Sequence, residues 1–203
     1  MPIFKEVPKP TDTEVKRALA ALKINNEQYN LQEEILEEVF TNLKTNTNLK
    51  EVYIKATLLN QYYSTNIYDV YRMAVHITEI PDVDERIKRG DPKVVEEIAN
   101  VKLKNEKQIK FYSFATKYCS FSNRLSYGTG RDDYPIYDRF VVKMLKHFRN
   151  KNKKSFTFKN TDLDNYEEFK KIVENFIKFF GLSGFTFKQI DKYLWSEGKE
   201  YFK

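Results

Sequence analysis

Apolar residues recur along this chain at the spacing of an α-helix. In one window Leu31, Ile35, Val39 and Leu43 stand four residues apart, which places them on one helical face. The long Lys/Glu-rich windows contain few helix breakers. The pattern therefore predicts an all-α protein of about eight to ten helices. The expected helices cover residues 12–24, 31–46, 48–63, 67–80, 92–100, 138–150, 165–180 and 186–202.

Local start and stop signals agree with these ranges. Residues 11–13 offer an N-cap for the first helix, and Gly181 follows the last apolar position of the helix over 165–180. Pro92 fits the first turn of a short helix, with Asp91 as its cap. Residues 81–92 hold two prolines and a glycine, so they are expected to form a connector with one helical turn.

Composition narrows the classes of function. The formal net charge is +6 and the pI about 9.1, which permits nucleic-acid binding without demonstrating it. A single cysteine excludes an internal disulfide and a four-cysteine iron–sulfur cluster, and two isolated histidines give no metal signature. No apolar run approaches the ~20 residues of a membrane span. We expect a cytoplasmic protein, nucleoid-associated if bacterial, with no metal and no membrane partner.

The segment over residues 111–140 carries the candidate chemistry. Lys117 is embedded among apolar residues, where desolvation disfavours the charged amine and can make it a nucleophile. Asp138 follows Pro135 and opens the next helical pattern, where a helix N-terminus stabilises a carboxylate. The structural alternative is a lysine that snorkels to solvent and an ordinary capping aspartate.

Two runs in this segment resemble the helix-hairpin-helix DNA glycosylases, above all the 8-oxoguanine glycosylase branch. The runs are Phe-Tyr-Ser-Phe-Ala-Thr-Lys at 111–117 and Tyr-Pro-Ile-Tyr-Asp at 134–138. The family reads Leu-Pro-Gly-Val-Gly-x-Lys and, after a gap, Pro-Val-Asp. Lys117 and Asp138 fall on its catalytic lysine and aspartate. Ser113 and Ala115 replace its two hairpin glycines, and one extra residue separates Pro135 from Asp138.

The resemblance implies a fold and an activity. It implies a two-lobed helical bundle with a central cleft that contains Lys117 and Asp138. Lobe one would take residues 11–80 and 164–203, and lobe two residues 91–150. The activity implied is excision of a modified purine from duplex DNA by a monomer without a cofactor, through a Schiff base on Lys117. The basic segment over residues 102–110 would form the first helix of the hairpin unit.

The resemblance also assigns contact residues. Gln189 and Tyr193, four apart on the last helix, match a glutamine and an aromatic that read and stack the extruded base, and Cys119 is a further base contact. Tyr193 is otherwise a core aromatic. The expected DNA contacts are Asn60, Gln61, Asn66, Ser113, Lys143, Lys146, Arg149, Lys151, Lys153 and Lys154. The turn over residues 64–66 is otherwise an N-cap, and the basic run otherwise complements a helix dipole.

Two other functions remain compatible with these residues. The first is a non-catalytic nucleic-acid or protein-binding module on the same scaffold, which Ser113 and Ala115 favour. The second is a glycosylase for another base, such as a modified base of foreign DNA.

Overall fold

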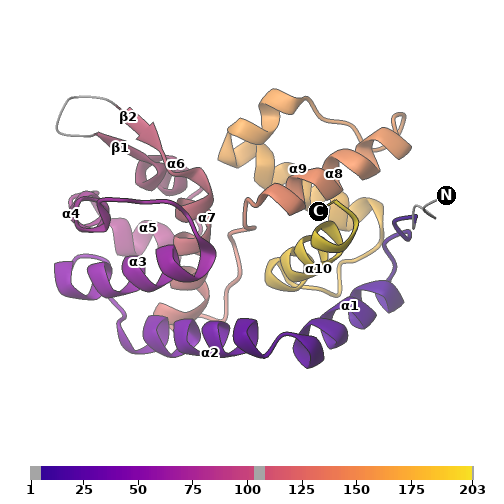
Figure 1. Cartoon of the computed structure of the whole chain (residues 1–203). Coiled ribbons are helices and arrows are strands. Elements are labelled where there is room, and N and C mark those ends of the chain that lie inside the picture. Colours follow the sequence, from indigo (N-terminus) through magenta and orange to yellow (C-terminus); the bar gives the residue numbers. More distant parts are fainter. Residues whose placement is uncertain (1–5, 103–107, 203) are drawn as a thin grey trace. The chain divides into compact units, whose positions relative to one another are not determined.

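The computed structural model describes residues 6–102 and 108–202, and within them the chain is mostly helical (Figure 1). It divides into two compact units. Unit 1 takes the described residues up to Glu27 together with those from Tyr137 onward, and unit 2 takes those from Gln28 to Ile136. Residues 28–80 thus belong to the same unit as the segment that follows them, whereas the predicted lobe one combined residues 11–80 with 164–203.

Unit 1 consists of four α-helices and one 3-10 turn within the described residues. The helices are α1 (Asp12–Asn25), α8 (Arg139–Lys151), α9 (Tyr166–Phe179) and α10 (Phe187–Tyr201), and the turn is Asn160–Asp164. Helix α10 packs against both α1 and α8. It approaches α8 closely at Gly198, where a Cβ atom would lie 2.7 Å from the carbonyl oxygen of Phe140. Thr11 caps α1, which agrees with the N-cap predicted at residues 11–13, and Asn165 and Thr186 cap α9 and α10.

Unit 2 contains the other six α-helices of the described chain. They are α2 (Glu27–Asn42), α3 (Leu49–Tyr63), α4 (Val70–Thr78), α5 (Val83–Lys88), α6 (Lys93–Ala99) and α7 (Tyr112–Phe121). A π-helical segment, Ser122–Ser126, continues α7 directly. The short strands β1 (Asn100–Lys102) and β2 (Gln108–Lys110) pair antiparallel between α6 and α7.

The strand pair corrects the predicted helix over residues 102–110. Residues 100–102 and 108–110 form strands, whereas 103–107 lie outside the described residues. The residue buried in β1 is Val101, which pairs with Ile109, and its neighbours Asn100 and Lys102 are more exposed. This alternation is the period-two pattern of a strand. The helix that precedes α7 is therefore α6, which ends before the basic segment begins.

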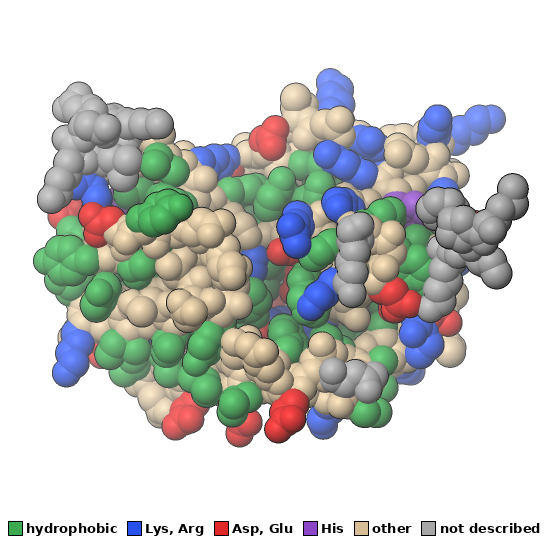
Figure 2. Space-filling view, in the orientation of Figure 1, with side chains coloured by type: hydrophobic (Ala, Val, Ile, Leu, Met, Phe, Trp, Pro, Cys, Tyr) green, Lys and Arg blue, Asp and Glu red, His purple; other side chains and the backbone are tan. Residues whose placement is uncertain are grey.

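The buried face of helix α2 differs from the apolar face that was predicted for residues 31–46. It begins and ends about four residues earlier than predicted, and its buried positions are Glu33, Leu36 and Phe40. Leu31, predicted to be buried, is 56% exposed. A solvated face was predicted for the acidic residues of this helix. It is wrong for Glu33, whereas Glu34, Glu37 and Glu38 are exposed, and Figure 2 shows acidic side chains on the surface over α2.

A buried polar network joins the α2–α3 loop to α5, α7 and the π-helical segment. Lys55 is fully buried, and its ammonium donates to the carbonyl of Thr45 (2.9 Å) and to Asn46 Oδ1 (2.7 Å). The amide of Asn46 donates to Asp84 Oδ1 at 2.9 Å. The Tyr127 hydroxyl also donates to Asp84 Oδ1, at 2.9 Å. Every polar group named here has a partner, so the network fixes the loop over 43–48 against unit 2.

Candidate active site

Lys117 lies in the middle of α7 and is only 3% exposed. Its ammonium donates to the hydroxyl of Ser113, one turn earlier, at 2.7 Å. It also lies 5.3 Å from the centre of the Tyr63 ring, a distance at which the ring quadrupole stabilises a cation. The side chain therefore does not snorkel to solvent, which was the structural alternative. The prediction that its flanks leave it little route to water is confirmed.

Tyr63 and Glu33 support this lysine from two other helices of unit 2. Tyr63 ends α3, and its hydroxyl donates to Glu33 Oε1 of α2 at 2.6 Å. This hydrogen bond orients the Tyr63 ring, and the ring in turn lies against the amine of Lys117. Glu33 is consequently buried with a partner, which explains how a carboxylate is tolerated on the inner face of α2.

The segment in which Ser113 and Ala115 replace the hairpin glycines is helical. Ser113 and Ala115 lie in the first turn of α7, and neither has a positive φ. The segment before them is β2 rather than a glycine turn. Ser113 therefore holds Lys117, and its predicted contact with DNA stays a prediction. The segment before Lys117 therefore differs from a hairpin with glycines. Lys117 itself lies in α7, the helix that follows this segment.

Asp138 occupies the position predicted for it at the start of the next helix. It is the N-cap of α8, and its Oδ1 accepts from the backbone N–H of Phe140 at 2.8 Å. The carboxylate thus lies at the positive end of the helix dipole. Asp138 belongs to unit 1 and Lys117 to unit 2, so the predicted cleft that contains both stays a prediction.

The three residues predicted to contact the base have other surroundings. Cys119 is fully buried, and burial strongly raises the pKa of its thiol. It is two residues from Lys117 and therefore points about 200° away around the helix. Gln189 forms a capping box with Thr186, with bonds of 2.9 and 3.3 Å. Tyr193 is fully buried in unit 1, as expected for the alternative in which it is a core aromatic.

The predicted DNA-facing turn between α3 and α4 is organised by Asn60. Its Oδ1 accepts from Thr65 Oγ1 and the N–H of Ile67, and its Nδ2 donates to the Ile67 carbonyl. Asn66 has φ 59°, a left-handed conformation that asparagine tolerates. Gln61 and Asn66 are exposed. The alternative N-cap at 64–66 is wrong, because Asp69 caps α4 instead, accepting from Arg72 N–H at 3.0 Å.

Half of the basic run is engaged in interactions within unit 1. Lys143 donates to the carbonyl of Phe202 at 2.7 Å, and Arg149 donates to the carbonyl of Phe158 at 3.2 Å. Lys151 forms an ion pair with Glu6 at 2.5 Å. Lys146, Lys153 and Lys154 form no hydrogen bond or ion pair within the described part of the chain. Figure 2 shows Lys and Arg side chains on the surface over α8 and the segment after it.

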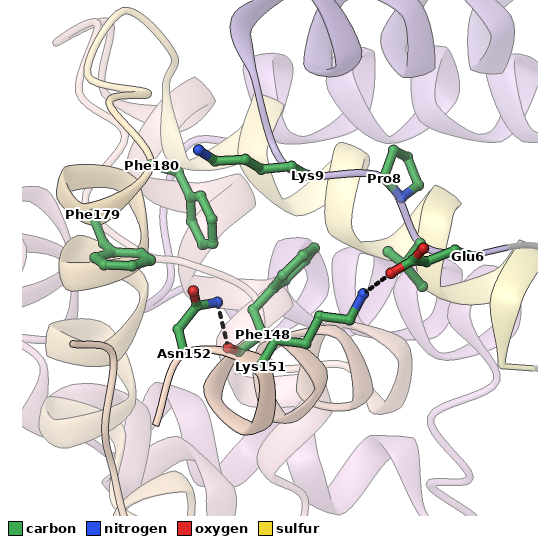
Figure 3. Close-up of a pocket in the computed structure, with 9 residues that line it drawn as sticks. Glu6, Pro8, Lys9, Phe148, Lys151, Asn152, Phe179 and Phe180 are labelled. Atoms are coloured by element: carbon green, nitrogen blue, oxygen red, sulfur yellow. Dashed lines mark hydrogen bonds and ion pairs between the residues drawn. The ribbon is translucent and has the colours of Figure 1, made fainter. Parts of the chain in front are cut away.

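The pair of Lys151 and Glu6 lies beside a cavity of about 600 Å³ in unit 1 (Figure 3). Phe148, Phe179 and Phe180 line it, and Figure 3 shows the side chain of Lys9 extending toward Phe180. The dashed lines in Figure 3 mark the ion pair and a hydrogen bond from Asn152 to the Phe148 carbonyl. Lys151 therefore has an ion-pair partner within unit 1, in addition to its predicted contact with DNA.

Several residues of unit 2 that bear on its chemistry were not predicted from the sequence. Tyr63 and Glu33 sit in windows that read as ordinary helix, and only their meeting across two helices reveals a pair. Arg124, in the π-helical segment, lies 5.2 Å from the centre of the Phe121 ring. Tyr68 is fully exposed in the α3–α4 turn. An aromatic residue in a polar turn was the signal that could have identified it.

The described residues offer no group of three or more His, Cys, Asp or Glu side chains that could hold a metal ion. Among these residues there is also no helix with the length and apolar content needed to cross a bilayer.

Comparison with known proteins places the chain in a family. A family model described as the N-terminal domain of HI_0787_N matches residues 14–126, a region that includes Lys117 and ends before Asp138. An uncharacterized protein of Haemophilus influenzae is 39% identical over 160 residues, which cover 79% of this chain and 72% of that relative. No solved structure gives a significant match. The model match and this relative show that the chain belongs to the HI_0787_N family.

Proposed function

We propose that this protein is a DNA glycosylase with AP lyase activity, acting on an oxidised or otherwise modified purine such as 8-oxoguanine. The observation that carries the proposal is the state of Lys117: an amine that is 3% exposed, oriented by the Ser113 hydroxyl and facing the Tyr63 ring. Amines held in such apolar surroundings serve as nucleophiles in Schiff-base chemistry. The sequence pattern from Phe111 to Asp138 supports the same activity.

In this proposal the deprotonated amine of Lys117 attacks C1′ of an extruded nucleotide. The C1′–N bond to the base breaks, and the base leaves with the electron pair and takes up a proton. The amine, having formed a C–N bond, opens the sugar to a protonated Schiff base. Loss of a proton from C2′ then expels the 3′ phosphate and cleaves the strand. No metal or organic cofactor takes part in these steps.

Asp138 is proposed to stabilise the positive charge that develops on the sugar while the base departs. Its carboxylate already accepts a backbone N–H at the start of α8, which keeps the side chain in one orientation. Lys146, Lys153 and Lys154 are proposed to contact DNA phosphates. The structural support for this is that the described residues leave their ammonium groups without hydrogen bonds or ion pairs.

Borohydride trapping tests the proposal directly. Wild-type protein is incubated with duplexes that carry 8-oxoguanine, other modified purines or a preformed abasic site, and the covalent adduct is measured. We expect an adduct with at least one duplex and none with Lys117→Gln. Lys50→Gln is the matched control, because Lys50 is an exposed lysine of the same unit and its loss removes the same charge. Full base excision by Lys117→Gln would refute the assignment.

A non-catalytic DNA-binding module is the second candidate. The observation in its favour is that Lys117 is nearly inaccessible and already bonded to Ser113 in the place of a hairpin glycine. In that case wild-type protein binds the duplexes but gives no adduct with any of them. An adduct with a modified base other than an oxidised purine would instead identify a glycosylase for another target.

A further inference from the structure

The guanidinium of Arg124 has two buried N–H groups without an acceptor. Its Nε and Nη2 atoms are shielded from solvent and form no hydrogen bond within the described part of the chain. These two atoms lie on one edge of the guanidinium, and their N–H bonds point in parallel. That edge is the one that binds a carboxylate or phosphate in a bidentate manner. An unpaired edge of this kind calls for an explanation, such as an anion that binds there.

The surroundings of Arg124 leave this edge without an acceptor within the described part of the chain. The guanidinium carbon lies 5.2 Å from the centre of the Phe121 ring, so the ring stabilises the charge but accepts no conventional hydrogen bond. The residue as a whole is half-buried. Rotation about its terminal bonds can therefore turn the edge toward solvent, and a bound oxyanion would supply both missing acceptors.

Arg124 lies in the π-helical segment that directly continues α7, the helix that carries Lys117. The two residues are seven apart, which is about two turns and roughly 10 Å along the helix axis. Phe121 lies between them in sequence, and its ring centre is 6.2 Å from that of Tyr63, the residue that faces Lys117. The π-helical segment that holds Arg124 is a deformation that occurs frequently at functional sites.

We propose that Arg124 is an anion-binding residue that holds a backbone phosphodiester of DNA beside Lys117. A phosphodiester offers two oxygens to the paired N–H groups of Arg124. The inference deepens the proposed function and rests on it for the identity of the ligand. The oxyanion site itself depends only on the geometry of Arg124.

Thermal unfolding with inorganic phosphate tests the oxyanion site apart from DNA. Melting temperatures are compared in phosphate and in chloride at equal ionic strength for wild type, Arg124→Gln and Arg89→Gln. Arg89 is the matched control, because it is exposed and lies in the same unit, and its side chain forms a long ion pair with Asp91 at 3.6 Å. We expect phosphate to raise the melting temperature of wild type and Arg89→Gln, but not of Arg124→Gln.

DNA binding tests the source of the phosphate. Affinity for a duplex with an uncleavable abasic analogue is measured over a range of salt concentrations. Arg124→Gln should weaken binding about tenfold and lower the log–log salt slope by about 0.9, while Arg89→Gln changes neither. Arg124→Lys keeps the charge but loses the paired edge, so it should retain the slope and recover only part of the affinity.

The outcomes separate this inference from the proposed function. If wild type gives a trapped adduct while Arg124→Gln binds DNA with unchanged affinity and slope, the inference is overturned and the glycosylase stands. If phosphate protects wild type and Arg124→Gln weakens DNA binding, yet no adduct forms, the site stands and the glycosylase falls. Protection by phosphate with unchanged DNA binding would overturn the DNA assignment. A lower melting temperature of Arg124→Gln in chloride, with no phosphate effect in wild type, would make Arg124 structural.

Discussion

Lys55 should make the stability of the protein rise with pH above neutrality. Its side chain is fully buried, and burial lowers the pKa of the amine from 10.5 to about 8, although Asp84 and Glu51 act in the opposite direction. Below pH 8 both the folded and the unfolded chain carry the proton, and the folded state bears the whole cost of burying the charge. Between pH 8 and 10.5 the unfolded chain keeps a proton that the folded chain has lost. Stability therefore rises with pH in that window.

The magnitude follows from the size of the shift. One pKa unit corresponds to 1.36 kcal/mol, so a shift from 10.5 to about 8 amounts to roughly 3 kcal/mol in full. About 2 kcal/mol of this is relieved between pH 7 and pH 9.5. The pH range ends at 9.5 because burial raises the pKa of Tyr118 and Tyr127 in the folded protein. Ionisation of these tyrosines in the unfolded chain, near pH 10, would favour unfolding and mask the effect of Lys55.

The assay is urea unfolding of wild type, Lys55→Met and Lys50→Met at pH 7, 8, 9 and 9.5. The free-energy difference between wild type and Lys55→Met should move by about 2 kcal/mol in favour of wild type over this range. Lys50 lies at the exposed start of the same helix, so Lys50→Met removes the same charge and should keep the wild-type slope. Equal slopes for wild type and Lys55→Met would refute the argument.

Two further predictions concern unit 1. Gly198→Ala should lower the free energy of unfolding by about 1–3 kcal/mol in urea titrations, because its Cβ would meet the backbone of Phe140 at 2.7 Å. Gly184→Ala, where no atom lies within 4 Å of the added Cβ, is the control and should change little. Asp138→Ala should cost about 1 kcal/mol of stability through loss of the N-cap, whereas Asp138→Asn keeps a capping oxygen. Under the proposed function both variants lose base excision; a fully active Asp138→Asn would remove the carboxylate from the mechanism.

Much of the helical fold was predictable because local signals decide where these helices begin and end. Thr11, Asp138, Asn165 and Thr186 cap helices within one residue of the predicted starts. The errors arose where tertiary contacts override the local pattern. Glu33 is buried because Tyr63 reaches it from another helix, and this shifts the inner face of α2 away from the apolar stripe.

Only part of the candidate site could be predicted from the sequence, because some of its contacts are tertiary and leave no local pattern. Burial of Lys117 and capping by Asp138 follow from neighbours in the sequence, and the structure confirms both. The partners of Lys117 could not be predicted in the same way. Ser113 was read as a substitute for a hairpin glycine, whereas it accepts a hydrogen bond one helical turn away. Tyr63 comes from a helix more than fifty residues earlier, and no periodicity in either window links the two.

Three cationic side chains of unit 2 differ in the groups that surround their N–H donors. Lys55 is fully buried, and two oxygens accept from its ammonium, so the fold accounts for it. Lys117 is almost as deeply buried, and its ammonium donates to the Ser113 hydroxyl at 2.7 Å and lies 5.3 Å from the centre of the Tyr63 ring. Arg124 has a ring contact and two buried N–H groups with no acceptor in the described chain. A buried N–H group without an acceptor requires an explanation, and for Arg124 the explanation that we propose is a bound anion.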